Sequence, residues 1–182
     1  KIDTSKSKIR NILYRPFCVQ SILYVKELIE AAGILPSLYS ADKNQSISIT
    51  GISGNKNFSV LMSLMIPEVQ LISNGVNFPL YQEKNSDNLF EENGKDNYAI
   101  SDFALDHFDQ RYEGKNITKD DLFFYIYGLL HSEDYRSRFA NNLTKELPRI
   151  PAVKKYDDFK EFSEKGKILS DLHINYNEVE PY

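Results

Sequence analysis

The sequence predicts a single α+β domain formed by residues 1–182. A chain of 182 residues is long enough to bury one hydrophobic core. Its content of 41% hydrophobic, 13% aromatic and 26% charged residues is typical of a globular protein rather than of a disordered one. Apolar residues alternate with polar ones in the middle of the chain and later recur at helical spacing, which places strands before helices, as in α+β domains.

The N-terminal region predicts a strand or turn followed by a short helix. Residues 8–17 mix basic and apolar side chains, and Pro16 favours an extended backbone at Arg15. Residues 21–32 carry apolar side chains at helical spacing, and a glycine and a proline follow them. We therefore expect a strand or turn at 8–17 and a helix at 21–32.

The middle of the chain predicts a group of strands. Short apolar or alternating runs, separated by turn residues, occupy residues 46–50, 58–62 and 69–72. Asn74-Gly75 is the dipeptide that best tolerates positive φ at both central positions of a tight turn. We therefore expect a hairpin in which Val69–Ser73 pairs with Val76–Tyr81.

A polar loop is expected between these strands and the helices that follow. Residues 83–97 are acidic and rich in asparagine, with little apolar surface to bury. Helical spacing returns in residues 100–108. Thr118 stands three residues before Asp121, which resembles a capping box, so a further helix is expected to start there.

The last third of the chain predicts two more helices joined by an extended connector. Ser132 and the two acids after it indicate a helix start, because carboxylates favour the positive end of a helix. Pro148 and Pro151 cannot continue that helix and leave Arg149 on an extended segment. Apolar residues at helical spacing over 156–176 predict the final helix.

The net charge of -4 conceals an uneven distribution of charge. Residues 1–60 carry eight Lys/Arg against four Asp/Glu, and residues 136–167 carry nine against five. Residues 83–121 instead carry eleven acids against five bases. A folded surface built from these segments could present a basic face, suited to nucleic acid, beside an acidic one. The alternative is that these charges only solvate helix faces and bind no partner.

The single cysteine and the absence of long apolar runs bear on the compartment. Cys18 cannot form an internal disulfide, which makes a reducing cytoplasm the simplest location, and we expect its thiol to be packed in the core. No run approaches the roughly 18 apolar residues of a membrane span, so no membrane partner is expected. The first residue is Lys1 rather than Met, and we interpret the chain as a fragment of a larger polypeptide.

We predict no catalytic or metal site. The three histidines, His107, His131 and His173, are widely separated and lack the spacing of zinc ligands. Residues 51–58 contain two glycines but lack the Gly-Lys-Ser/Thr ending of a phosphate-binding loop. With Lys56 at its tip, this segment is either an ordinary connection or a phosphate contact. Acid and lysine groupings at 113–115 and 158–160 fall in a loop and a helix, not at the adjacent strand ends that metal-dependent nucleases use.

Three ordered blocks of sequence carry a resemblance to a known family. They are Leu13-Tyr14-Arg15-Pro16-Phe17; then Ile49-Thr50-Gly51, Lys56-Asn57-Phe58-Ser59, Ile66-Pro67-Glu68 and Phe78-Pro79-Leu80-Tyr81; then Ile117-Thr118-Lys119-Asp120-Asp121, Ile126-Tyr127-Gly128-Leu129-Leu130-His131-Ser132, Tyr135-Arg136, Glu146-Leu147-Pro148-Arg149-Ile150-Pro151, Gly166-Lys167, Asp171-Leu172-His173 and Glu178-Val179-Glu180-Pro181. Over nearly the whole chain they resemble the C-terminal target-recognition domain of type ISP restriction-modification enzymes. The chain departs from that family at Cys18, where an acid is usual, and at Glu133, where a proline is usual.

The resemblance implies a non-catalytic, cytoplasmic module that recognises a short sequence in double-stranded DNA. It implies that nuclease, ATP-driven translocase and adenine methyltransferase parts lie upstream in the same polypeptide and are partners of this module. It also implies that the fragment itself binds no cofactor, whereas the parent uses AdoMet, ATP and Mg. The alternative is an interaction domain that docks onto the upstream parts without reading bases.

Recognition of a duplex by this module requires cations for phosphates and polar side chains for base edges. We expect the polar loops to supply both and the helices to act as a scaffold. Arg15, Arg136 and Arg149 are each either phosphate contacts or structural clamps on carboxylates. The residues predicted to contact DNA are Arg15, Lys43, Asn44, Gln45, Asn55, Lys56, Asn57, Lys84, Asn85 and Arg149.

Overall fold

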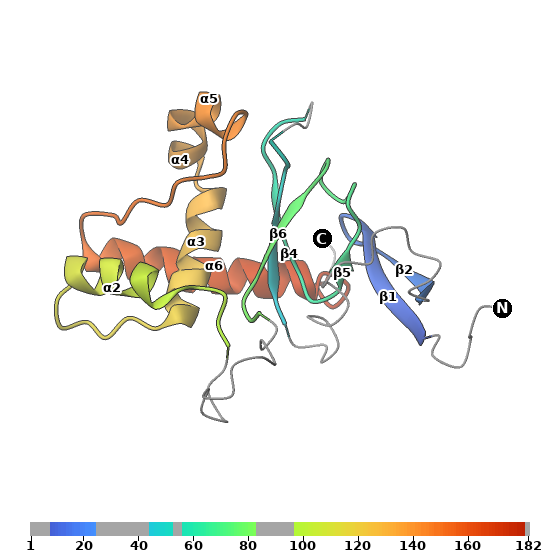
Figure 1. The fold of residues 1–182 in the computed structure, drawn as a ribbon, viewed down its shortest axis with the longest axis horizontal. Helices are drawn as coiled ribbons and strands as arrows, with labels where there is room; N and C mark the ends of the chain where they lie inside the picture. The colour runs from blue at the N-terminus through green and yellow to red at the C-terminus, as the bar shows by residue number, and fades with distance from the viewer. Residues whose placement is uncertain (1–7, 25–43, 53–55, 83–96, 181–182) are drawn as a thin grey trace.

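The computed structural model describes residues 8–24, 44–52, 56–82 and 97–180. In this part of the chain two small sheets lie beside a group of helices, which confirms the predicted α+β class (Figure 1). The strands are β1 (Lys8–Arg15), β2 (Cys18–Tyr24), β3 (Ser46–Ile49), β4 (Val60–Ser63), β5 (Ile66–Pro67) and β6 (Val76–Pro79). The helices are α2 (Asp102–Arg111), α3 (Lys119–His131), α4 (Glu133–Arg138), α5 (Ala140–Leu143) and α6 (Tyr156–Ile174).

The first sheet has the strand order β2-β1-β5. β1 and β2 form an antiparallel hairpin whose turn includes Phe17 with a φ of 59°. β5 runs parallel to β1, with Ile12 opposite Ile66. The strand expected at residues 8–17 is therefore confirmed, and it becomes the central strand of this sheet.

The helix predicted at residues 21–32 is wrong where the structure describes it. Ser21–Tyr24 belong to β2 and pair with β1, and residues 25–32 lie outside the described residues. The segment 18–24 contains β-branched and aromatic side chains that fit a pleated surface, and apolar residues at 22 and 24 also match the period of a strand. Pairing with β1 satisfies the backbone of this segment, which overrides its weak helical spacing.

The second sheet has the order β4-β3-β6, with β3 antiparallel to both neighbours. All four residues of β3 are buried, and its isoleucines pack in the main core with residues of α3. Leu61 belongs instead to a small cluster with Leu13 of β1 and Leu71. This cluster joins the two sheets. The strands expected at 46–50 and 58–62 are confirmed.

The hairpin predicted at Asn74-Gly75 is wrong, although the strand after it exists. Residues 69–73 form a turn, and β6 pairs with β3 rather than with the segment before it. Positive φ occurs at Ser73 (67°) and Asn74 (51°), one position earlier than the dipeptide suggests. The backbone of 69–73 makes bonds within its own loop, with Leu71 N donating to Glu68 O at 2.8 Å and Gly75 N to Val69 O at 2.9 Å.

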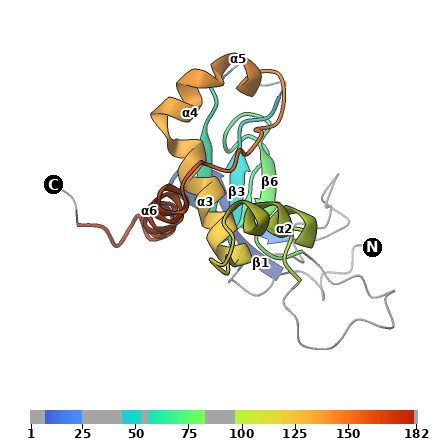
Figure 2. The same cartoon turned by 90° about the vertical axis from the view of Figure 1, so that its left-hand side faces the viewer.

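Helix α3 is the centre of the main core and begins where the sequence predicts. Thr118 and Asp121 form the expected capping box, with reciprocal bonds of 3.1 and 2.9 Å between side chain and backbone. Figure 2 shows α3 between α6 and the second sheet, in agreement with its contacts to both α6 and β4. Backbone contact between α3 and α6 needs glycine, because a Cβ at Gly128 or Gly166 would lie 2.3 or 2.0 Å from a carbonyl oxygen of the other helix.

The connector at residues 148–153 is extended, as the prolines predict, and three tyrosines hold it in place. Tyr135, Tyr125 and Tyr112 donate their hydroxyl groups to carbonyl oxygens of residues 149, 151 and 153, at 2.8, 2.5 and 2.7 Å. These tyrosines are buried, so their hydroxyls replace the water that an extended backbone would otherwise bind. The helices expected at 100–108, after Ser132 and over 156–176 are confirmed as α2, α4 and α6.

Candidate nucleic-acid interface

A hollow of about 250 Å³ forms where three segments far apart in the sequence meet, and we call it the polar hollow because most residues in its wall are of charged or polar types. The end of β1, the loop between β3 and β4, and the loop between β5 and β6 each contribute to its wall. The residues that line it are Arg15, Pro16, Thr50, Lys56, Asn57, Ser59, Gln70, Leu71 and Ile72. Three of the predicted DNA contacts, Arg15, Lys56 and Asn57, are therefore brought together.

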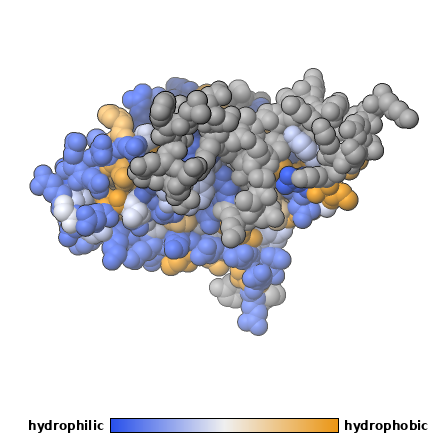
Figure 3. Space-filling view, turned by 60° about the horizontal axis from the view of Figure 1, so that its bottom comes forward, coloured by the Kyte–Doolittle hydropathy of each residue, from blue (hydrophilic) through white to orange (hydrophobic). Residues whose placement is uncertain are grey.

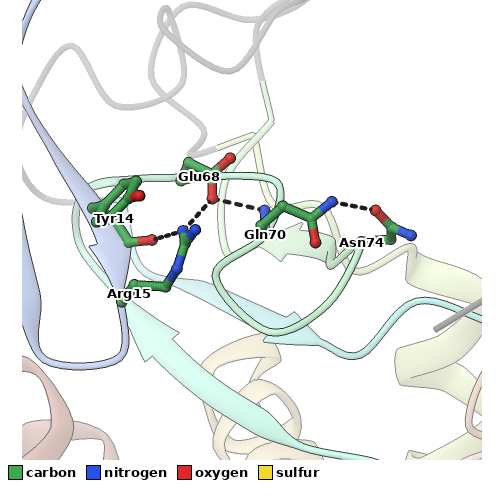
Figure 4. Close-up of polar contacts among 5 residues, drawn as sticks. All are labelled: Tyr14, Arg15, Glu68, Gln70 and Asn74. Carbon is green, nitrogen blue, oxygen red and sulfur yellow. Dashed lines mark hydrogen bonds and ion pairs between the residues drawn. The ribbon is translucent and has the colours of Figure 1, made fainter. Parts of the chain in front are cut away.

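Arg15 is held at the end of β1 by its own neighbour and by Glu68. Its Nη1 donates to the Tyr14 carbonyl oxygen at 2.6 Å and to Glu68 Oε2 at 2.7 Å (Figure 4). The guanidinium also lies 4.0 Å from the centre of the Tyr14 ring. The Arg15 side chain is 42% exposed, and within the described residues its other two nitrogens have no partner. A half-exposed ion pair of this kind adds little stability, but it fixes the direction of the guanidinium.

Glu68 connects Arg15 to the loop between β5 and β6. Its Oε2 accepts a second bond from the backbone N–H of Gln70 at 2.8 Å, and the Gln70 amide then donates to Asn74 Oδ1 at 2.6 Å (Figure 4). Backbone N–H groups and cations that point at one carboxylate make strong, charge-assisted bonds. The result is a continuous polar chain from β1 to Asn74.

The loop between β3 and β4 closes the opposite side of the polar hollow. Thr50 and Ser59 are paired through their backbones at 3.0 Å, and the Thr50 hydroxyl also accepts from Ser59 N at 2.8 Å. Lys56 and Asn57 lie between them and are exposed. Among the described residues no carboxylate forms an ion pair with Lys56. A cation in this position is available to an anion from outside the domain.

Gly51 brings the two loops into direct contact. Its N–H donates to the Ser73 carbonyl oxygen at 3.2 Å, and a Cβ at this position would lie 2.0 Å from the Asn74 carbonyl oxygen. Only glycine leaves room for such an approach of two backbones. The loop that carries Lys56 and the loop that carries Gln70 are thus packed as one surface.

The other predicted contacts lie elsewhere. Asn44 is buried and bonded twice to the backbone of Tyr81, at 2.7 and 3.0 Å, and Gln45 accepts from the Ser170 hydroxyl at 3.2 Å. Arg149 is 85% exposed on the connector and pairs with Glu146 at 3.0 Å. Lys43, Asn55, Lys84 and Asn85, together with residues 83–96 of the predicted polar loop, lie outside the described residues.

Arg136 serves the scaffold rather than the hollow. Its Nε donates to the Leu130 carbonyl oxygen at 2.7 Å, and the guanidinium lies 5.8 Å from the centre of the Phe58 ring. These contacts support a structural role for Arg136. Arg149 shows a mixed arrangement, because it binds Glu146 and yet remains largely in solvent. Bonds from Asn142 and then from Arg149 hold the pKa of Glu146 below its usual value.

Sequence reasoning missed Glu68, Gln70 and Asn74. The segment 69–73 was expected to be a strand rather than a loop. A partial signal existed, because a glutamate, a glutamine and an asparagine stand within seven residues beside a glycine. The pairing of Glu68 with Arg15 spans 53 positions and leaves no local signal.

Cys18 differs from its predicted environment, and two histidines that are distant in the sequence lie side by side in the fold. Cys18 is exposed at the start of β2, so the prediction of a buried core thiol is wrong: on this outer strand its side chain meets solvent. His131 and His173, 42 residues apart in sequence, lie with ring centres 5.6 Å apart, and Tyr127 bonds to His173 Nδ1. Within the described residues, no group of three or more His, Cys, Asp or Glu side chains could hold a metal ion.

Hydrophilic side chains cover most of the described surface on the face that Figure 3 shows, and apolar groups there are small and separate.

An apolar hollow of about 280 Å³ lies between the second sheet, α3 and the connector. Phe78 and Leu147 are part of its lining and are 40% and 42% exposed. None of the helices that the structure describes has the length and apolar character needed to cross a membrane.

Comparison with known proteins identifies relatives over the whole chain. The family model for the type ISP C-terminal specificity domain matches residues 1–182. A search of curated proteins finds no significant match.

Three solved structures resemble the described fold. A cryo-EM structure of a DrdV–DNA complex has a TM-score of 0.82 and 33% identity over 96% of this chain. A nuclease-deletion mutant of the type ISP restriction-modification enzyme LlaGI, in complex with a DNA substrate mimic, has a TM-score of 0.71 and 31% identity over 96%. The ATP-dependent type ISP restriction-modification enzyme LlaBIII bound to DNA has a TM-score of 0.77 and 29% identity over 97%. The matched region spans 16%, 12% and 11% of those chains, respectively.

Proposed function

This chain belongs to the family of type ISP C-terminal specificity domains, and on that premise we propose that it recognises a short sequence in double-stranded DNA. The similar solved structures are DNA complexes, two of them of type ISP restriction-modification enzymes, which supports DNA as the partner. The observation that carries the proposal is the polar hollow, where Arg15 and Lys56 lie beside exposed polar side chains. Such a combination supplies both positioning and readout of a duplex.

In the proposed complex, the two cations of the polar hollow contact phosphates and set the register of the domain on the duplex. Arg15 uses the nitrogens that Glu68 leaves unoccupied, and Lys56 has no ion pair within the described residues. Asn57 and the polar residues of the facing loop are then positioned to meet base edges. Arg149 provides a separate contact. Lys43, Asn55, Lys84 and Asn85 remain candidates, whereas Asn44 and Gln45 support the scaffold.

We assign no catalytic step to this chain and propose that it selects the site on which other parts of a larger enzyme act. The matched region is 11 to 16% of the solved relatives, so most of each relative lies outside it. The proposal is that upstream nuclease, ATP-dependent translocase and adenine methyltransferase parts receive DNA in the register that this domain sets. AdoMet, ATP and Mg would be bound by those parts.

A second candidate function is docking onto another domain without base readout. The apolar hollow beside Phe78 and Leu147 favours it, because half-exposed apolar side chains around a cavity suit a protein partner. The two functions differ in what they require of Arg15 and Lys56. Only DNA recognition makes these cations necessary for binding a duplex.

The test measures duplex binding by the protein in its full natural length. Wild type is expected to select one sequence from a randomised duplex pool. Arg15→Ala and Lys56→Ala are each expected to weaken binding to that sequence by about tenfold, which corresponds to roughly 1.4 kcal/mol for one charge-assisted contact. Lys160→Ala removes an equal charge from α6, where Lys160 pairs with Glu164, and serves as the matched control.

Thermal unfolding of each variant establishes that the fold is retained. Binding that is equally strong in Arg15→Ala, Lys56→Ala and wild type would contradict the proposed interface. Absence of any selected sequence in the wild-type pool would instead favour the docking function.

A further inference from the structure

The loop between β5 and β6 is built as a rigid support for two amide side chains. At its start, Glu68 Oε2 accepts a hydrogen bond from Gln70 N at 2.8 Å. At its end, Gly75 N donates to the Val69 carbonyl oxygen at 2.9 Å. The contact of Gly51 with Ser73 and Asn74 fixes its middle. Residues whose backbone is held in this way lose little further freedom on binding a ligand.

Gln70 and Asn74 bind each other and remain exposed to solvent. Gln70 Nε2 donates to Asn74 Oδ1 at 2.6 Å, which uses the donor group of one amide and the acceptor of the other. Gln70 Oε1 and Asn74 Nδ2 have no partner within the described residues (Figure 4). Whichever way the two amides are turned, the pair keeps one carbonyl oxygen and one NH2 group that are wholly unused, besides a second N–H and a second lone pair on the two bonded atoms.

Adenine is the base that presents both an acceptor and a donor on its own major-groove edge. Adenine presents the N7 acceptor next to the N6 amino donor, which is complementary to the amide pair. Guanine presents two acceptors there, cytosine an amino donor and thymine an acceptor next to a methyl group. An amide pair that meets N6 with its unused oxygen and N7 with its unused NH2 would favour adenine over the other three bases.

The position of the pair places it beside the groups that would hold the DNA backbone. Gln70 lines the polar hollow together with Arg15 and Lys56, and Glu68 links it directly to Arg15. Phosphate contacts set the register and an adjacent rigid polar group reads the base. On the basis of the proposed function, we propose that Gln70 and Asn74 form a paired amide that reads one adenine in the major groove of the target sequence.

The test compares sequence selection by the full-length wild-type protein and by Gln70→Ala. The substitution keeps the backbone bond to Glu68 and removes the amide. We expect wild type to select a sequence with an adenine that Gln70→Ala no longer distinguishes, with a loss of preference of about tenfold at that position and retention at the others. Gln82→Ala removes an exposed amide outside the polar hollow and is the matched control.

A modified base separates direct contact from a structural effect. Replacing that adenine by 7-deazaadenine removes the N7 acceptor, and it is expected to weaken wild-type binding by about tenfold while leaving the binding of Gln70→Ala unchanged. The assignment is overturned if Gln70→Ala selects the same sequence as wild type, or if it loses preference only at a position without adenine. Either result leaves the proposed function intact. Failure of wild type to select any sequence overturns both.

Discussion

At the scale of single residues, His131 combines burial with an unsatisfied ring nitrogen. Its Nε2 is buried and has no hydrogen-bond partner among the described residues, while Nδ1 lies 3.4 Å from Arg136 Nη2. Burial, then the charge of Arg136 and the neighbouring His173, lower the pKa of His131 to about 4. His131 also lines a third hollow, between α3 and α6, whose wall includes the charged residues Asp158, Glu161 and Lys165. The folded protein therefore holds this imidazole neutral where the unfolded chain would protonate it.

This predicts that the domain loses stability as the pH falls from about 6.5 towards 4. In that window the unfolded chain binds a proton that folded His131 excludes, so acid favours unfolding. Allowing for partial exposure of the ring, we expect the loss from His131 to be about 1 kcal/mol at pH 5. The measurement is the free energy of unfolding against pH in wild type, in His131→Gln and in His107→Gln, whose histidine is exposed.

His131→Gln is expected to flatten the acid side of the stability profile. A profile that is equally steep in all three proteins would show that other groups control the acid unfolding. Burial also lowers the pKa of His173, so His173 likewise reduces stability as the pH falls. The stability of His131→Gln is therefore expected to keep part of its dependence on pH.

At the scale of elements, the contact between α3 and α6 depends on two glycines. A Cβ at Gly166 would lie 2.0 Å from the Phe124 carbonyl oxygen and 2.8 Å from Gly128 N. Both neighbours are backbone atoms of a helix and cannot turn aside as a side chain would. The two helices also stack Tyr125 on Phe159, with ring centres 4.6 Å apart. Separating the helices would therefore disturb the aromatic core.

We predict that Gly166→Ala destabilises the domain by about 2–3 kcal/mol, the usual cost of overpacking, even though alanine favours helices more than glycine does. Gly114→Ala is the control, because no atom of the described residues lies within 4 Å of a Cβ added at Gly114, whereas its φ is +76°. Its expected loss is about 1 kcal/mol from backbone strain alone. Chemical denaturation measures both. A smaller loss for Gly166→Ala than for Gly114→Ala would contradict close packing of α3 on α6.

Elements whose signals are local were predictable from the sequence, and those set by distant pairing were not. The capping box at Thr118 and the non-helical connector between Pro148 and Pro151 depend on residues within a few positions, and both appear in the structure, although the preceding helix α5 already ends at Leu143. The strand at 21–24 exists because β1 lies beside it, and the turn at 69–73 exists because Gly51 approaches it. The part of the polar hollow that the sequence predicted, Arg15, Lys56 and Asn57, rests on residue type, whereas Glu68 and Gln70 join it only through the fold.

At the scale of the whole molecule, an overall negative chain carries a local cationic site. The net charge is -4, yet Arg15 and Lys56 line the polar hollow. In the proposed complex the net charge of the domain would oppose the approach of DNA, so cations at the contact surface would have to supply the attraction. The slope of the binding constant against salt concentration, on logarithmic axes, then gives the number of phosphates that these contacts neutralise.

We predict that the slope of log binding constant against log salt concentration becomes shallower by about 0.9 for each phosphate contact removed. Arg15→Ala and Lys56→Ala in the full-length protein are each expected to show this change. Gln70→Ala, which removes a base contact in our proposal, is expected to weaken binding with the slope retained. Equal slopes for all four proteins would mean that neither cation neutralises a phosphate.

The approach of Gly51 to Asn74 has a consequence for engineering. Because the two backbones touch, the segment around Lys56 and the segment around Gln70 share one boundary, and neither can change its course without displacing the other. If only one segment were replaced by that of a relative with another target, its backbone would no longer fit against the other segment where Gly51 meets Asn74. New specificities are better obtained by exchanging residues 50–59 and 68–75 together, because the two segments then keep the backbone contact that they make in the relative.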